Sequence, residues 1–392
     1  MKAVGQQLKF YYYFCGIMSG IYIHIPFCKQ LCYYCDFHFS VSLERKNEML
    51  DAIAKEIQIR ANELDEKPKT LYFGGGTPSI YKPEELKIIV DEVKRKFNVD
   101  NFLEFTVEVN PDDLDKKYLE ELQELGVNRL SIGIQSFIDE HLRFMNRRHT
   151  ASQSVECIKT AQSAGFKNIN IDLIYGLPQL TLQQWRKNIS IFLDLDIPHL
   201  SAYHLGIEPR TVFYKRFEKG ELQPVTEKMS EEQYEILEQM TSDNGFEHYE
   251  ISNFAKDKCY SVHNTSYWQG KPYMGFGASA HSYDGKKNRR WNISNNKKYI
   301  EAINTNQTFW ENEILSNVES YNDYILTSLR TVWGINLDFL RTNFGETLYN
   351  YFSEQSQRFI QQGLLICDGE QIKIPTKHFL LSDGIIRELM NC

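Results

Sequence analysis

Six apolar, β-rich runs alternate with helical patterns in the first half of the chain, and this alternation constrains the fold more than any other feature. The runs cover residues 21–25, 70–73, 104–109, 129–134, 168–174 and 199–205. The helical patterns between them cover residues 45–64, 83–97, 114–125, 151–164 and 182–195. Repeated β–α units predict a parallel sheet with right-handed crossovers. An open sheet and an incomplete barrel both fit this pattern.

Polar or glycine-rich residues follow the strand-like runs, at the point where each run ends. The second run leads into Gly74-Gly75-Gly76-Thr77, and Glu108, Gln135, Asp172 and Glu208 stand at or after the ends of later runs. Loops at the carboxyl ends of parallel strands converge on one rim, where α/β barrels carry their active sites. We therefore expect a functional site at that rim.

Three cysteines follow the first strand-like run with the spacing C-x₃-C-x₂-C. They are Cys28, Cys32 and Cys35, and the other five cysteines are scattered along the chain. A disulfide scaffold would be shorter and denser in cysteine. Clustered thiolates suit an iron–sulfur cluster or zinc, and zinc would need a fourth ligand such as Asp36 or His38. A [4Fe–4S] cluster held by three thiolates keeps one iron open for a small chelating molecule.

Composition narrows the classes of partner. The 392 residues carry 42% hydrophobic and 24% charged side chains and a formal net charge of −8. Because nucleic-acid binding needs clustered basic residues, this charge argues against a general nucleic-acid binder. The aromatic stretch at residues 10–18 is too short to span a bilayer, so no transmembrane segment is expected. We interpret residues 1–17 as a dispensable extension before a natural start at Met18, with a membrane-surface anchor as the alternative.

The regular β–α alternation ends at about residue 210, which predicts that the rest of the chain forms other structural units. We expect a main α/β domain over residues 18–260, a connecting region over 261–315 and a smaller α+β domain over 316–392. Helical patterns at 320–331, 337–344 and 348–362 precede short β-like pieces near 364–367 and 371–374, and a last helix at 382–390. This order is typical of a winged-helix-like domain, which need not bind DNA.

The cysteine spacing and the residues downstream resemble the radical S-adenosylmethionine (SAM) superfamily. Within it, the chain is similar to the group that contains the oxygen-independent coproporphyrinogen III oxidases of porphyrin biosynthesis and related heme chaperones. The resemblance covers residues 20–392 and is carried by residues 22–37, 74–79, 108–111, 133–137 and 172–178. It implies an incomplete (β/α)6 TIM-like barrel, and a [4Fe–4S] cluster whose open iron holds S-adenosylmethionine.

The resemblance also implies which residues line the SAM pocket. They are Tyr22, Tyr34, Gly75, Gly76, Thr77, Glu108, Gln135, Arg147 and Asp172. Their chemistry agrees with this role. Arg147 offers a planar fork for a carboxylate, and Glu108 and Asp172 can accept hydrogen bonds from ribose hydroxyls. Glycine lets a backbone approach a ligand without interference from Cβ.

Two departures separate this sequence from the oxidases. Phe37 stands where they carry a further cysteine, and the chain enters the cysteine motif almost at once. The stretch from His263 to Trp268 reproduces the H-N-x-x-Y-W signature of the heme chaperones. We therefore expect a cytoplasmic heme chaperone, associating with the membrane surface, that delivers heme to acceptors such as membrane-bound respiratory enzymes.

Alternatives stay open at this point. His263 is a candidate heme ligand, but it could instead have a structural role, and His24, His38 and His281 are other candidates. The second hypothesis is a radical SAM enzyme that decarboxylates a porphyrinogen. The third is an interaction protein with a vestigial cluster. Whether the chain is an enzyme is left open.

Overall fold

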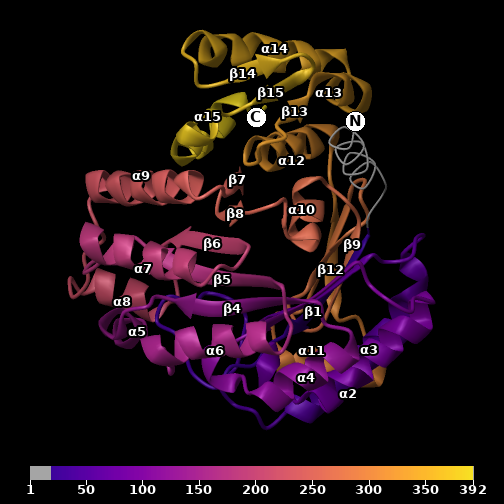
Figure 1. Ribbon diagram of the computed structural model, residues 1–392. Helices are drawn as coiled ribbons and strands as arrows, with labels where there is room; N and C mark the ends of the chain where they lie inside the picture. Colours follow the sequence, from indigo (N-terminus) through magenta and orange to yellow (C-terminus); the bar gives the residue numbers. More distant parts are fainter. Residues whose placement is uncertain (1–18, 392) are drawn as a thin grey trace, which may run out of the picture.

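A curved, mixed sheet forms the centre of the molecule in the computed structural model, which describes residues 19–391 (Figure 1). Its six successive parallel strands each pair with the next, so every expected strand is present. They are β1 (Gly20–Ile25), β2 (Thr70–Gly75), β3 (Glu104–Val109), β4 (Arg129–Gln135), β5 (Asn168–Tyr175) and β6 (His199–His204). The expected extension at residues 1–17 lies outside the described residues.

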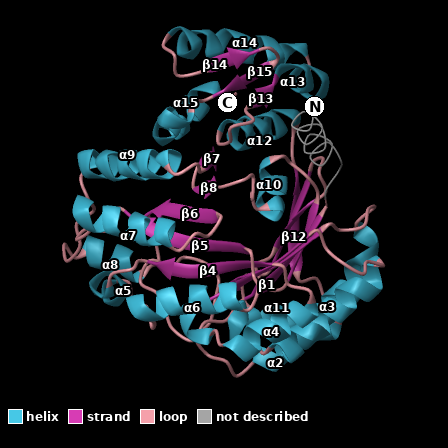
Figure 2. Ribbon diagram, in the orientation of Figure 1, coloured by secondary structure: helices cyan, strands magenta, loops and turns pink. Residues whose placement is uncertain are grey.

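The crossover helices cover the outer face of this sheet (Figure 2). They are α2 (Lys46–Arg60), α3 (Pro83–Phe97), α4 (Lys116–Leu125), α5 (Asp139–Phe144), α6 (Ala151–Ser163) and α7 (Leu182–Asp194). Thr150 and Thr181 cap α6 and α7 in capping boxes, and Gly126 ends α4 in the left-handed conformation. These caps satisfy backbone groups that a helix end would otherwise expose.

Short strands extend the sheet at both edges, and the sequence pattern did not predict them. Beyond β6 lies β8 (Asn253–Ala255), antiparallel to β6, and then β7 (Glu247–Glu250), antiparallel to β8. Beyond β1 lies β9 (Tyr273–Phe276), which is parallel to β1, followed by antiparallel β10 (His281–Tyr283), β11 (Asn288–Asn292) and β12 (Trp310–Ile314). The end strands β7 and β12 have no strand partner on their outer sides within residues 19–391, so the barrel is incomplete.

Four further helices lie between β6 and β12 in the chain. They are α8 (Val212–Glu218), α9 (Glu227–Asp243), α10 (Val262–Trp268) and α11 (Asn296–Thr305). The stretch 261–315, expected as a connecting region, therefore contains two helices and four strands of the main sheet. Among residues 19–391, no helix is long and apolar enough to cross a membrane.

The C-terminal part forms a separate small sheet with helices around it, at the top of Figure 1. Its order is α12 (Asn317–Leu329), β13 (Ile335–Asn336), α13 (Leu337–Phe344), α14 (Glu346–Gln361), β14 (Ile366–Asp368), β15 (Gln371–Lys373) and α15 (Ser382–Leu389). The strands are antiparallel in the order β13-β15-β14. This is the winged-helix-like arrangement that the sequence predicted.

Candidate functional site

The cysteine loop follows β1 and is fixed by backbone hydrogen bonds from separate parts of the chain. The Cys28 N–H donates to Ser40 O at 3.0 Å. The Tyr33 N–H donates to Met145 O at 3.1 Å, and Tyr33 O accepts from the Phe213 N–H at 3.0 Å. Cys28, Cys32 and Cys35 are all half-buried free thiols. The loop backbone is therefore held in place while its three sulfurs stay partly open.

Two of the three sulfurs accept hydrogen bonds from residues expected in the SAM pocket. Thr77 Oγ1 donates to Cys28 Sγ, and Arg147 Nη1 donates to Cys32 Sγ, both at 3.4 Å. Burial raises the pKa of the Cys28 thiol to about 11 and that of the Cys35 thiol to about 12. To serve as iron ligands, these thiols would have to lose their protons.

The donor set fits an iron–sulfur cluster better than a single metal ion. Within residues 19–391, no three cysteine, histidine, aspartate or glutamate side chains are arranged to hold one metal ion. His38, considered as a fourth zinc ligand, hydrogen-bonds Asn296 Oδ1 through Nε2 at 2.8 Å. Three partly open thiols with hydrogen-bond donors beside two of them match the soft ligands that a [4Fe–4S] cluster requires.

The glycines at the end of β2 allow the strand to lie against the root of the cysteine loop. Gly75 has a φ of +104°, and a Cβ there would lie 2.5 Å from the His24 ring. A Cβ on Gly76 would lie 2.5 Å from Phe27 O. The Gly76 and Thr77 N–H groups donate to Ile25 O and Phe27 O, each at 2.8 Å. These glycines are therefore required by the packing of the chain itself, whether or not a ligand also approaches them.

Glu108 and Asp172 place two carboxylates on neighbouring parts of the barrel interior. Glu108 accepts from the Tyr72 hydroxyl at 2.7 Å and from the Gly75 N–H at 3.2 Å. Asp172 accepts from Asn170 Nδ2 at 2.8 Å. Burial raises the pKa of Glu108 to about 7 and that of Asp172 to about 6. Both groups can therefore change protonation near neutral pH.

Arg147 connects the cysteine loop to the strand ends. Besides Cys32, its guanidinium donates to Asn110 Oδ1 at 2.6 Å and to Gly133 O at 2.7 Å. Asn110 in turn donates to Thr77 Oγ1 at 3.1 Å. The sequence reasoning did not single out Asn110 as a site residue. Its signal was its place directly after β3, within the stretch 108–111 that carries the family resemblance.

The remaining expected pocket residues lie on the same rim or just inside it. Gln135 ends β4 at a register irregularity with a φ of +66°, a strained conformation that is common at functional sites. The Tyr22 hydroxyl lies 3.1 Å from His24 Nδ1. Tyr34 lies beside Cys32 and Arg147, and burial raises its pKa. The structure thus places the cysteine loop and the ends of β1 to β5 at the same rim of the barrel.

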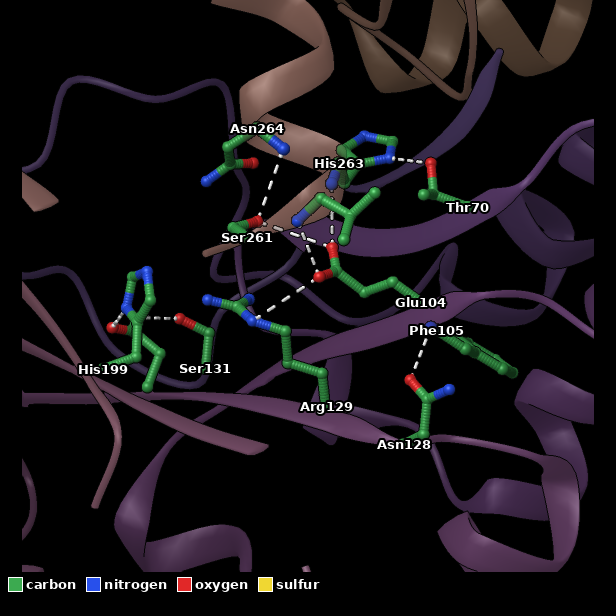
Figure 3. A network of polar contacts seen from close by, with 12 residues as sticks. Thr70, Glu104, Phe105, Asn128, Arg129, Ser131, His199, Ser261, His263 and Asn264 are labelled. Carbon is green, nitrogen blue, oxygen red and sulfur yellow. Dashed lines mark hydrogen bonds and ion pairs between the residues drawn. The ribbon is translucent and has the colours of Figure 1, made fainter. Parts of the chain in front are cut away.

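His263 lies beside Thr70, the first residue of β2 (Figure 3). The cysteine loop follows the end of β1, so His263 lies at the opposite end of the barrel from it. Its Nδ1 is 2.7 Å from Thr70 Oγ1, and its Nε2 is 2.6 Å from the Tyr267 hydroxyl. Only 1% of the residue is exposed, and burial lowers its pKa to about 3. In this arrangement the imidazole has no nitrogen free for iron, so its position favours the structural role.

The other candidate histidines differ in their availability. His24 is buried, with Nε2 bonded to His38 O at 2.9 Å. His38 is bonded to Asn296. His281 is exposed, with its ring stacked on Trp291 at a centroid distance of 6.2 Å. Of these three, His281 has the most accessible ring.

Comparison with known proteins agrees with this architecture. Residues 22–190 match the radical SAM superfamily, and residues 315–381 match the HemN C-terminal domain. The E. coli coproporphyrinogen III oxidase HemN, a radical SAM enzyme, has the same fold, with a TM-score of 0.82 and 22% identity, over 95% of this chain and 90% of that one. The fold and the cysteine loop thus define a radical SAM protein, whose superfamily implies a [4Fe–4S] cluster and S-adenosylmethionine.

Curated relatives specify the family further. The heme chaperone HemW of Bacillus subtilis is 36% identical over 89% of this chain and 93% of its own length. HemW of Lactococcus lactis is 32% identical over 95% of this chain and 97% of its own. The chain belongs to the HemW family of heme chaperones.

Proposed function

We propose that this chain binds heme and delivers it to acceptor proteins, and that it carries a [4Fe–4S] cluster ligated by S-adenosylmethionine. The observation that carries the proposal is the similarity to HemW over nearly the whole chain, including both the barrel and the C-terminal domain. Membrane-bound respiratory enzymes remain our proposed acceptors. We also propose a cytoplasmic location, from which the protein reaches the membrane surface.

The cluster and the SAM pocket are proposed on the geometry of the rim. Cys28, Cys32 and Cys35 would hold a [4Fe–4S] cluster and leave one iron without a protein ligand, available to S-adenosylmethionine. The Arg147 guanidinium hydrogen-bonds Cys32 of this loop, and Glu108 and Asp172 supply hydrogen-bond acceptors inside the barrel. When bound, the cluster supplies one-electron chemistry, and the protein contributes orientation and charge.

A second candidate function is porphyrinogen decarboxylation, favoured by the shared fold with the E. coli oxidase. Phe37 counts against it, because its side chain has no thiol and the residue is 68% exposed beside the cluster loop. Any step that needs a thiol at this position cannot run.

The deciding experiment is anaerobic reconstitution with iron and sulfide, followed by two assays on the same sample. We expect hemin titration to give a saturable Soret band, and bound heme to pass to a heme-free b-type cytochrome. Coproporphyrinogen III, supplied with S-adenosylmethionine and a reductant, should stay unconverted. Robust conversion would show that the protein acts as an oxidase and not as a chaperone. A failure to hold iron would favour an interaction protein with a vestigial cluster.

A further inference from the structure

The H-N-x-x-Y-W segment lies on the floor of the barrel, where the strands begin. It forms α10, whose first N–H groups are capped by Glu104 at the start of β3 (Figure 3). Glu104 accepts from the Val262 N–H at 2.8 Å and from the His263 N–H at 2.9 Å. Arg129 at the start of β4 lies 3.9 Å from the same carboxylate. This capping fixes the position of His263 relative to the strands.

The His263 ring contacts one particular side chain of the barrel interior. It stacks on Tyr72, with a centroid distance of 5.0 Å and an interplanar angle of 28°. The hydroxyl of Tyr72 donates to Glu108, and the other oxygen of Glu108 accepts from the Gly75 N–H. One continuous series of contacts therefore runs from the floor helix to the glycine-rich strand end at the rim.

Glycines on β1 and β2 make space for His263 at one end of this series and for Tyr72 and Glu108 at the other. A Cβ on Gly20 would lie 3.0 Å from the His263 ring and 2.7 Å from Thr70 Oγ1. A Cβ on Gly74 would lie 2.9 Å from both Glu108 Oε1 and the Tyr72 ring. Such contacts are too close for any residue but glycine, since the neighbours on both sides are themselves held by hydrogen bonds. The packing of His263, Tyr72 and Glu108 thus depends on glycines in β1 and β2.

We propose that His263 is a positioning residue for the SAM pocket: it holds the Tyr72 ring so that the Tyr72 hydroxyl orients Glu108 and, through it, the Gly75 strand end. This inference rests on the proposed assignment of Glu108 to that pocket. It gives the H-N-x-x-Y-W histidine a role other than ligation of heme iron.

The test measures S-adenosylmethionine affinity of the anaerobically reconstituted full chain, together with cluster content and heme binding. Tyr72→Phe removes only the hydroxyl and should weaken binding about three- to tenfold, because the lost hydrogen bond orients Glu108 and does not itself contact S-adenosylmethionine. His263→Ala should weaken it by a similar factor. Because both residues act through Glu108, the double variant should bind no more weakly than the worse single variant.

A rescue distinguishes positioning from general loss of structure. The pair His263→Phe and Tyr267→Phe restores a flat ring against Tyr72 and removes the hydroxyl that a larger ring would meet. This pair should recover most of the affinity lost in His263→Ala, although a phenyl ring cannot ligate iron. His248→Ala is the matched control. His248 is a buried histidine on β7, and its removal should leave S-adenosylmethionine affinity unchanged.

The outcomes separate this inference from the proposed function. If Glu108→Ala binds S-adenosylmethionine as tightly as the parent chain, the proposed pocket is wrong. If Glu108→Ala weakens binding but Tyr72→Phe and His263→Ala do not, only the positioning role is wrong. A His263→Ala variant that keeps S-adenosylmethionine but loses heme would overturn the inference in favour of an iron ligand. If His263→Ala does not fold, Tyr72→Phe and the phenylalanine pair still decide the question.

Discussion

The rim and the floor of the barrel are held together in different ways. At the rim, backbone hydrogen bonds to residues 40, 145 and 213 and side-chain hydrogen bonds such as that between Asn146 and Leu31 O hold the cysteine loop, while its thiols stay half-buried. On the floor, side chains from distant strands and α10 bond one another, and Glu104, Arg129 and His263 are almost fully buried. The thiols at the rim therefore stay partly accessible, whereas the buried network on the floor joins α10 to the starts of β2, β3 and β4.

The sharpest test of this contrast is removal of one thiol. Cys32→Ser should abolish the cluster, because two thiolates cannot replace three on a four-iron core, while the fold survives. Iron and sulfide content after reconstitution measures the effect, and circular dichroism checks the fold. Cys157→Ser is the control, since that buried cysteine lies on α6, away from the loop. A full complement of iron in the Cys32 variant would contradict the assignment.

The corresponding change on the floor should affect stability instead. Glu104→Ala removes the cap of α10 and leaves the buried Arg129 without its carboxylate, which should cost about 3–5 kcal/mol of unfolding free energy. The midpoint of urea denaturation reports the loss. Glu84→Ala is the control, because its pair with Lys82 is exposed and should contribute less than about 1 kcal/mol. Equal midpoints for the two variants would show that the floor network does not stabilise the barrel.

Removing the arginine that connects the cysteine loop to the strand ends should reduce affinity without removing the cluster. Arg147→Ala deletes a charge-assisted contact worth roughly 1.5–3 kcal/mol, so S-adenosylmethionine should bind about one to two decades more weakly. Asp172→Ala should act in the same direction. Anaerobic equilibrium dialysis measures both, with iron content as the internal check. Unchanged affinity in both variants would disprove the transfer of these residues from the family resemblance.

The smallest effect is expected in the pH dependence of stability. Burial raises the pKa of Glu108 from 4.5 to about 7, so the folded chain holds a proton there that the unfolded chain has lost. The contribution of Glu108 to the unfolding free energy therefore falls as pH rises from about 4.5 towards 7. Glu108→Gln cannot titrate, so its unfolding free energy should fall less steeply over that window than that of the parent chain. Parallel profiles for the two proteins would show that Glu108 ionises normally.

The rim was predictable from the sequence and the floor was not. The cysteine spacing, the glycine run and the polar strand ends lie in short stretches, so the strands β1 to β6 and the rim site could be expected. In the sequence, Glu104 and Arg129 were only the first residues of two apolar runs. Their role in the network that caps α10 could not be predicted, because α10 lies more than 130 residues further along the chain. His263 was singled out by its motif, but its partners Thr70 and Tyr72 come from β2. The edge strands β7 to β12 were missed because strands this short show no clear alternation.

The pairing of β9 with β1 also bears on the order in which the protein is made. β1 meets β2 soon after it is synthesised, but its other edge pairs only with residues 273–276. During translation, domains begin to fold from the N-terminus, and an unpaired strand edge is prone to aggregate. The strand that leads into the three cysteines therefore keeps one edge open until most of the chain has left the ribosome. Any truncation before residue 276 leaves that edge permanently exposed.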